Sequence, residues 1–341
     1  MIPLPPSDPL WKGPIEDGCT QSIINKFLQC PFRFYLYAIL GLEEDTPPHP
    51  NLVWGDCYHV GLEHLIQGDS LRDSQLAAIN YLDKEYGEFR NWTDDEGKPL
   101  FNYESYRKSI PLMLSYYDTN IIQEDNLITE DSFNVKFQGY RFRGKRDVHA
   151  PDEAIGEHKA KKQISIDPVL LKEEITQDLQ CNIYMRISEV EKVYYDLIGI
   201  PESVKYGAPY KARNRTDAEY IQDCIIGGDY KPNKLFPICD NLHAWVHQSV
   251  HFIPHASQEK YWQQTVIPIV KRMHQWYDYV TDPNFDPNNP EHYNEVFFRM
   301  PVRIFLGSNT EKFKCEYHSY LTEQEEICNL REVSSMYKEL E

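Results

Sequence analysis

Three residues in the middle of the chain have the types and spacing that hydrolysis of a phosphodiester bond requires. Asp147 is followed by Glu157 and then by Lys159 in the segment RDVHAPDEAIGEHK. If a hairpin turn centres on Asp152, paired positions sum to about 304, so Asp147 lies directly across from Glu157. Opposed side chains in an antiparallel pair are about 5 Å apart, so the two carboxylates can share a divalent cation. Lys159 projects from the same face as Glu157, because side chains alternate along a strand.

Two carboxylates and an ammonium group at one spot match metal-assisted hydrolysis of a phosphate ester. Mg²⁺ or Mn²⁺ held by the carboxylates lowers the pKa of bound water and neutralises the charge that develops on the phosphate. The ammonium group of Lys159 can orient the attacking water and stabilise the transition state. Pro151-Asp152 also precedes Glu-x-Lys, but it lies at the predicted hairpin tip, so we favour Asp147. The spacing alone is a weak signal because it also arises by chance.

Helices are predicted before this hairpin. A helix capped by Thr20 or Ser22 runs to the break at Pro31, where a second helix begins that ends at Gly41. Trp54–Ile66 has the pattern of a third helix. These helices must pack around the strands that carry the acidic residues.

The periodicity then changes. Residues 70–130 are largely helical in pattern, whereas apolar residues alternate over 133–137 and 140–142, on either side of Gln138-Gly139. This alternation predicts a strand, a turn and a second strand, followed by the hairpin of Asp147 and Glu157. The later predicted elements are a helix over 168–190, a strand over 192–198, an irregular region over 200–240, a helix over 257–280 and a strand-like stretch from Val296 to Phe305.

The composition indicates a folded protein in a reducing compartment. The chain has 341 residues, of which 41% are hydrophobic, enough for a packed core. No apolar run is long enough to cross a bilayer, and the first residues lack the charged and apolar regions of a secretory signal. The eight cysteines contain no Cys-x-x-Cys pair. We therefore expect a cytoplasmic protein with no membrane contact.

The charge is distributed unevenly. The net charge of −18 argues by itself against a nucleic-acid partner, because phosphate binding usually needs a basic face. However, residues 136–162 include eight basic and four acidic side chains, and residues 205–215 include four basic and no acidic ones. These stretches are either two solvated faces or a surface for nucleic acid. The candidate nucleic-acid contacts are Arg33, Arg143, Lys145, Arg146, Lys161, Lys162, Tyr206, Tyr210, Lys211, Arg213 and Arg215.

Five short patterns stand in order along the chain and are more specific together than alone. A lone histidine on a helix usually belongs to the surface or core, and Gln180 with Tyr184 is ordinary helix spacing. In this order, over about residues 20–201, they resemble the RecB-like branch of the PD-(D/E)xK nuclease superfamily, especially its phage-encoded exonucleases. The patterns are Cys30-Pro31-Phe32-Arg33-Phe34, Gly55 with His59, Gly144-Lys145-Arg146-Asp147, Glu157-His158-Lys159, and Gln180 with Tyr184.

The resemblance implies a restriction-endonuclease-like α+β fold, with a central mixed β-sheet flanked by helices and with N-terminal and C-terminal helical extensions. We expect an irregular arm over residues 1–19 and a single nuclease domain over 20–341. The domain would divide into a helical part (20–130), a catalytic core (131–201) and a C-terminal extension (202–341).

The resemblance also implies a role for each motif residue. His59, Asp147 and Glu157 would hold one or two Mg²⁺ or Mn²⁺ ions, with the carbonyl of His158 as a further ligand. Lys159 would serve the attacking water. The residues that would position the scissile phosphate or the lysine are Gln180 and Tyr184.

Many members of this branch also bind a 4Fe–4S cluster through one cysteine before the nuclease core and three near the C-terminus. Here Cys30 can be the first ligand, but the C-terminal part offers only Cys315 and Cys328. We therefore expect no cluster and interpret the cysteines as free buried thiols.

The leading functional hypothesis is an exonuclease that acts on DNA ends in phage-type recombination, replication or DNA degradation. A structure-specific DNA endonuclease or an RNA endonuclease would use the same residues. A non-catalytic DNA-binding or protein-binding module is a third hypothesis, against which the complete His-Asp-Glu-Lys set counts. The acidic remainder of the surface would suit a helicase or a single-strand-annealing partner.

Overall fold

The computed structural model describes residues 2–44, 48–91, 93, 97, 99, 103–120, 127–161, 168–200, 246–297 and 330–332. The chain divides into two compact units. The first comprises Met1–Thr46, Ser132–Lys145 and Glu259–Glu341, and the second comprises Pro47–Asp131 and Arg146–Gln258.

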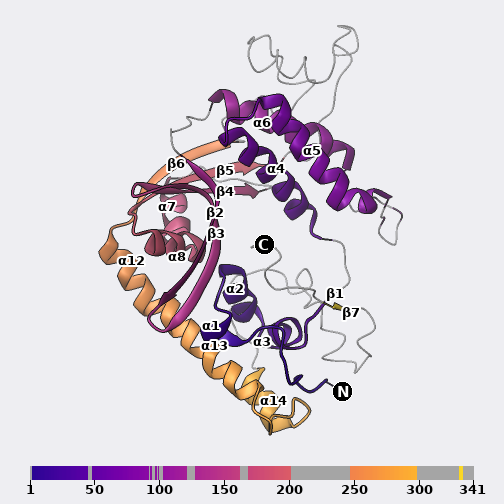
Figure 1. The fold of residues 1–341 in the computed structure, drawn as a ribbon, viewed down its shortest axis with the longest axis vertical. Helices are drawn as coiled ribbons and strands as arrows, with labels where there is room; N and C mark the ends of the chain where they lie inside the picture. The colour runs from indigo at the N-terminus through magenta and orange to yellow at the C-terminus, as the bar shows by residue number, and fades with distance from the viewer. Residues whose placement is uncertain are drawn as a thin grey trace. The chain divides into compact units, whose positions relative to one another are not determined.

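A mixed five-stranded sheet, drawn in Figure 1, is the centre of the fold, as the sequence predicted. Its order is β2-β3-β4-β5-β6, with β4 and β5 parallel and with antiparallel pairing of β3 with β4 and of β5 with β6. The edge strand β6 was not predicted. The strands are β2 (Ile128–Phe137), β3 (Tyr140–Ala150), β4 (Ala154–Lys161), β5 (Lys192–Gly199) and β6 (Val246–Phe252).

Both predicted turns are present. Gln138 and Gly139 join β2 to β3 with φ of 49° and 87°, the pair of positive values that a two-residue hairpin turn needs. In the second hairpin Val148 pairs with Gly156 and Ala150 with Ala154, so paired positions sum to 304 as predicted. Asp152 lies in the turn with φ of 61°.

In the second unit, one face of the sheet is covered by three helices, α4 (Pro50–Ile66), α5 (Leu71–Tyr86) and α6 (Tyr103–Asn120), with a 3₁₀ turn, η2 (Gly87–Asn91), after α5. Trp54 is fully buried and its indole donates to Ser109 Oγ at 2.9 Å. A Cβ on Gly61 would lie 2.5 Å from Leu114 Cδ1, so this glycine lets α4 and α6 approach closely. Ile198 on β5 completes this core from the sheet.

The other face of the sheet in this unit carries α7 (Pro168–Gln177) and α8 (Leu179–Ser188) (Figure 1). The sequence predicted one helix over 168–190, and this was wrong at Asp178. The carboxylate of Asp178 accepts from the backbone N–H of Cys181 at 2.7 Å, so it caps a new helix. This break sets where α8, and with it Gln180, begins.

The first unit has an aromatic core. Trp11, Phe27, Phe34 and Trp276 are buried, and the ring centroids of Trp11 and Phe34 lie 5.2 Å apart. Trp11 also donates to the carbonyl of Gly18 at 2.8 Å, so the N-terminal segment, expected to be an irregular arm, is anchored in this core.

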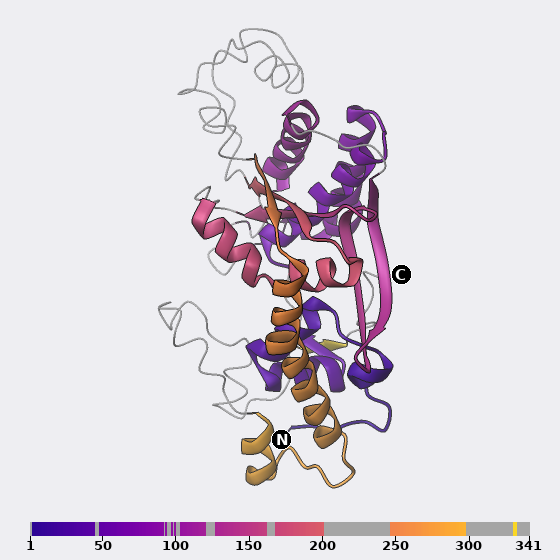
Figure 2. The same cartoon turned by 90° about the vertical axis from the view of Figure 1, so that its left-hand side faces the viewer.

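The elements of the first unit, which Figure 2 shows from a second side, differ locally from the sequence prediction. Thr20 caps α2, as predicted. The five residues after Phe34 form a π-helical turn rather than regular helix. Val296, where the predicted strand over 296–305 would begin, is the last residue of a helix, and residues 298–305 lie outside the described residues. No helix among the described residues is long and apolar enough to cross a membrane. The elements are α1 (Gly13–Glu16), α2 (Gln21–Gln29), α3 (Pro31–Phe34), η1 (Tyr35–Ile39), β1 (Leu42–Glu44), α12 (His255–Tyr261, which begins in the second unit), η4 (Trp262–Val266), α13 (Ile267–Val280), α14 (Pro290–Val296) and β7 (Leu330–Glu332).

Candidate metal and catalytic site

Asp147 lies where β3 and β4 stop pairing. The ladder between the two strands runs from Ala150 to Val148, and the next residue, Asp147, accepts a hydrogen bond from the backbone N–H of His158 at 2.8 Å through Oδ2. The carboxylate thus takes the place of a strand carbonyl. Its second oxygen, Oδ1, lies 3.7 Å from Nδ1 of His59 on α4.

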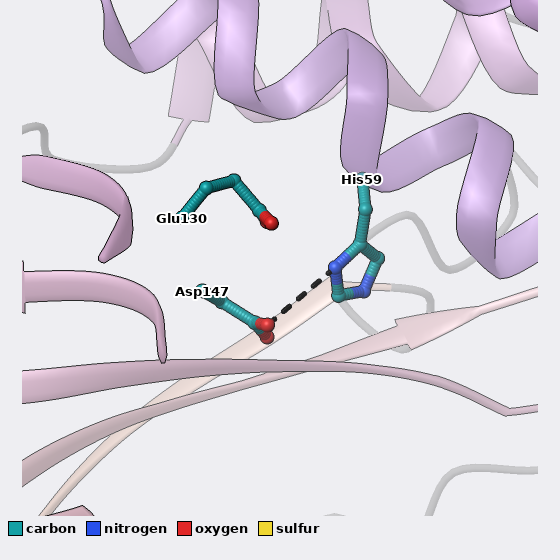
Figure 3. A group of neighbouring side chains, drawn as sticks. All are labelled: His59, Glu130 and Asp147. Carbon is teal, nitrogen blue, oxygen red and sulfur yellow. Dashed lines mark ion pairs between the residues drawn. The ribbon is translucent and has the colours of Figure 1, made fainter. Parts of the chain in front are cut away.

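A third residue joins His59 and Asp147. One ligand atom from each of His59, Glu130 and Asp147 lies within 4.8 Å of the other two. Figure 3 shows the carboxylates of Glu130 and Asp147 directed toward the imidazole of His59. The side chains of His59 and Asp147 are 27% and 15% exposed, so solvent reaches the group. One imidazole and two carboxylates are a donor set that suits a divalent cation such as Mn²⁺ or Mg²⁺.

Glu130 was not among the residues predicted from the sequence. The signal that could have found it is the same pairing rule that placed Asp147. A two-residue turn at Gln138-Gly139 makes positions across β2 and β3 sum to 277, which puts Glu130 opposite Asp147.

Glu157 belongs to a different set of contacts. Its side chain is 1% exposed and forms an ion pair with the ammonium group of Lys159 through Oε1. Its other oxygen, Oε2, accepts from Gln180 Nε2 at 3.0 Å, and Gln180 Oε1 accepts from Lys159 Nζ at 2.8 Å. The three side chains form a closed triangle between β4 and α8. Tyr184, one turn after Gln180, is also buried.

Burial and neighbouring charges shift these groups in different directions. Burial, reinforced by the charge of Asp147, raises the pKa of Glu157 to about 8. Burial alone would raise the pKa of Asp147, but the positive charges of His59, His158 and Lys159 outweigh it and hold that pKa below its usual value. Burial likewise opposes the charge on Lys159, yet Glu157 and Asp147 raise the pKa of its ammonium group, which therefore stays charged at neutral pH.

The side chain of His158 connects Asp147 to a second buried aspartate. His158 Nε2 lies 3.2 Å from Asp196 Oδ2, which also accepts from the hydroxyl of Tyr117 at 3.2 Å. His158 Nδ1 lies 3.8 Å from Asp147 Oδ2. Burial would lower the pKa of His158, but Asp196 and Asp147 outweigh it and raise that pKa. The imidazole of His158 thus lies beside Asp147 and next to the ring of His59, whose centroid is 6.0 Å away.

The candidate nucleic-acid contacts fall into four groups. Arg146 corrects the prediction, because its side chain is 8% exposed and its guanidinium pairs with Asp131 and donates to Ser188. Even-numbered positions of β3 are buried, so Arg146 points into the protein and is structural. Lys161 is more exposed and pairs with Glu174. Arg33, Arg143 and Lys145 lie in the first unit, and Lys162, Tyr206, Tyr210, Lys211, Arg213 and Arg215 lie outside the described residues.

The cysteines that were considered for a cluster are placed only in part. The thiol of Cys30 caps α3 by accepting from the N–H of Arg33 at 3.5 Å. Cys19, Cys57 and Cys181 are free and buried. Cys315 and Cys328 lie outside the described residues.

Comparisons with known proteins bear on this site. A family model described as the PD-(D/E)XK nuclease superfamily matches residues 19–198, a segment that contains every residue of the site. No curated protein sequence matches the chain. Among solved structures, the chain is similar to a phage related exonuclease from Haemophilus somnus 129PT, at 13% identity and a TM-score of 0.29 over 60% of this chain and 82% of that one. It is also similar to the protein SSO0001, at 14% identity and a TM-score of 0.20 over 54% and 86%.

Proposed function

Because the chain belongs to the PD-(D/E)XK nuclease superfamily, we propose that it hydrolyses DNA phosphodiester bonds with Mg²⁺ or Mn²⁺, as an exonuclease that acts on DNA ends. The observation that carries this proposal is the arrangement of one hairpin and the helix α4. A partly exposed His59–Asp147 pair adjoins a buried Glu157–Lys159 ion pair, so a cation site and a charged lysine stand next to each other. The proposed setting is phage-type recombination, replication or DNA degradation.

The sequence motifs assign the metal-binding role to His59, Asp147 and Glu157, with the carbonyl of His158 as a further ligand. Because Lys159 and Gln180 engage both oxygens of Glu157, we place the cation at His59 and Asp147. When bound there, a divalent cation supplies a lowered pKa for the attacking water and offsets the charge that develops on the phosphate. His158 and Asp196 keep Asp147 in place from the protein interior.

Lys159 is assigned to the attacking water and to the charge of the transition state. Its ammonium group is fixed by Glu157 on one side and by the Gln180 carbonyl oxygen at 2.8 Å on the other. A donor that is already held in position loses little free energy on ordering when the substrate arrives. Gln180 thus positions Lys159, and Tyr184 lines the same helix one turn further on.

The choice of an exonuclease rests on the order of the sequence motifs, which is that of phage-encoded exonucleases. The aromatic and basic residues of the segment 205–215 would hold the DNA strand by stacking and by charge. A negative overall charge of −18 requires such local basic surfaces if DNA is to bind.

The test is an incubation of matched linear and closed-circular DNA, single-stranded and double-stranded, with Mg²⁺ or Mn²⁺ and with EDTA. Lys159→Ala serves as the matched inactive variant. We expect only linear DNA to be degraded, and only with metal and with Lys159. Cutting of closed circles would replace the exonuclease by an endonuclease. Cleavage of RNA alone, or of neither nucleic acid by a folded protein, would contradict the proposed substrate or the proposed catalysis.

A further inference from the structure

We propose that Glu130 is a third side-chain ligand of the catalytic cation, together with His59 and Asp147. This proposal rests on the metal-dependent function proposed above and extends it, because Glu130 belongs to none of the sequence motifs. The ligand atoms of the three residues lie within 4.8 Å of one another, close enough to meet around one ion (Figure 3). They come from α4, β2 and β3, three elements that are separate in the sequence.

Glu157 is already engaged by other side chains, so a further carboxylate is needed beside His59 and Asp147. Both carboxylate oxygens of Glu157 are engaged within the protein, one by Lys159 and the other by Gln180. Asp147, by contrast, uses Oδ2 for the backbone of His158 and directs Oδ1 toward His59. On the His59 side of Asp147, the carboxylate within reach is therefore that of Glu130.

The pairing of β2 with β3 explains how Glu130 reaches this position. With paired positions that sum to 277, Asp131 opposes Arg146, and these two residues do form an ion pair. The same sum places the preceding residue, Glu130, opposite Asp147. Glu130 and Asp147 lie on the neighbouring strands β2 and β3.

The backbone at Glu130 is held in an unusual conformation. Its φ is 52°, in the left-handed region that residues with a Cβ rarely adopt. The neighbouring residue, Thr129, is hydrogen-bonded to the end of α4. The side-chain amide of Gln67 donates to Thr129 Oγ1 at 2.8 Å. Gln67 is the C-terminal cap of α4, the helix that carries His59. A hydrogen bond from the end of α4, the helix of His59, therefore joins it to the start of β2, the strand of Glu130.

The test is a calorimetric titration of the full-length, metal-free protein with Mn²⁺, without DNA. Glu130→Gln keeps the shape of the side chain and removes its charge. We expect it to weaken Mn²⁺ binding at least tenfold. Glu189→Gln is the matched control, because Glu189 is also a glutamate with a left-handed backbone, φ 55°, but it is exposed at the end of α8. It should bind Mn²⁺ within twofold of the parent.

A second variant guards against misfolding. Glu130→Gly accommodates a positive φ without strain and also removes the carboxylate, so it should lose the same affinity while remaining folded. Binding by Glu130→Gln and Glu130→Gly within twofold of the parent would overturn the role of Glu130. If Asp147→Asn lost binding in that experiment, the proposed metal site would stand without Glu130. If the parent itself bound no Mn²⁺ and cut no DNA, the proposed function would fail together with this inference.

Discussion

The polar side chains on the two sides of Asp147 differ in how closely they contact one another. On the α4 side, His59 and Asp147 are partly exposed and lie 3.7 Å apart, too far for a hydrogen bond. On the α8 side, an ion pair and two hydrogen bonds join Glu157, Lys159 and Gln180 to one another. The side chain of Glu157 is 1% exposed. One side has donor atoms spaced to surround an ion, and the other has a charged amine fixed in place.

The two sides therefore suit two different tasks, the binding of a cation and the positioning of a lysine. A ligand atom must direct a lone pair at the cation, whereas a lysine that must act at a set position needs hydrogen bonds that fix it. Asp147 joins the two sides, since Oδ2 is bonded to the backbone of His158 and Oδ1 faces His59. Variants on either side should therefore affect different measurements.

Removing Lys159 should have the largest effect on catalysis. We expect Lys159→Ala to lower kcat about a hundredfold to a thousandfold, the loss typical of one group that stabilises the transition state. Its Mn²⁺ affinity should stay within about twofold of the parent, because the α4 side is untouched. Single-turnover cleavage and Mn²⁺ titration measure the two quantities. Cleavage at the parental rate would show that the lysine has been assigned wrongly.

The two aspartates of the hairpin should differ sharply. Asp147→Asn should reduce Mn²⁺ affinity by more than the roughly 10- to 100-fold lost when an outer partner of a ligand is removed. Asp152→Asn should leave affinity unchanged, because Asp152 lies in the exposed turn and asparagine tolerates its φ of 61°. The opposite ranking in a calorimetric titration would mean that the ligand is the residue after Pro151.

The hairpin was predictable because strand pairing follows from arithmetic once the turn is recognised. The sum of 304 came from the turn at Asp152, and the same rule applied to Gln138-Gly139 would have placed Glu130. That residue was missed because it lies outside every motif. The left-handed φ of Glu130 and the hydrogen bond from Gln67 to the neighbouring Thr129 are tertiary features that no local sequence pattern encodes.

Other differences between prediction and structure also have local causes. Arg146 was counted with the basic surface, but a count of charge ignores that alternate residues of β3 face inward. The helix break at Asp178 was missed because the apolar spacing continues across it, and only the capping hydrogen bond to Cys181 reveals it. The buried Tyr117–Asp196–His158 network joins three elements, so sequence spacing could not show it.

The buried side should also give a pH-dependent stability. Burial and the charge of Asp147 raise the pKa of Glu157 above its usual value of 4.5, so as the pH falls the folded state takes up a proton at a pH where the unfolded carboxyl is still ionised. The free energy of unfolding in EDTA should therefore fall as the pH rises from 5 to 8, and the raised pKa of His158 acts in the same direction. Urea unfolding of Glu157→Gln should show a shallower decrease. An equal decrease in parent and variant would contradict the assignment.

The smallest expected effect concerns backbone strain. Glycine should relieve the left-handed conformation of Glu130 and of Glu189, and each substitution should raise the stability of the metal-free protein by about 1 kcal/mol. Excess Mn²⁺ should then stabilise the parent and Glu189→Gly more than Glu130→Gly, because stabilisation by a bound ligand falls as its affinity falls. Urea unfolding with EDTA and with Mn²⁺ measures both effects. Equal stabilisation of the two variants by Mn²⁺ would count against a ligand role for Glu130.

The most direct measurement is the position of Mn²⁺ in crystals, read from its anomalous scattering. We expect a peak within coordination distance of His59, Glu130 and Asp147, with Lys159 still hydrogen-bonded to Gln180. A peak held by Asp147 and Glu157 without Glu130, or no peak at this hairpin, would contradict the proposal that the cation binds on the α4 side and the α8 side positions Lys159.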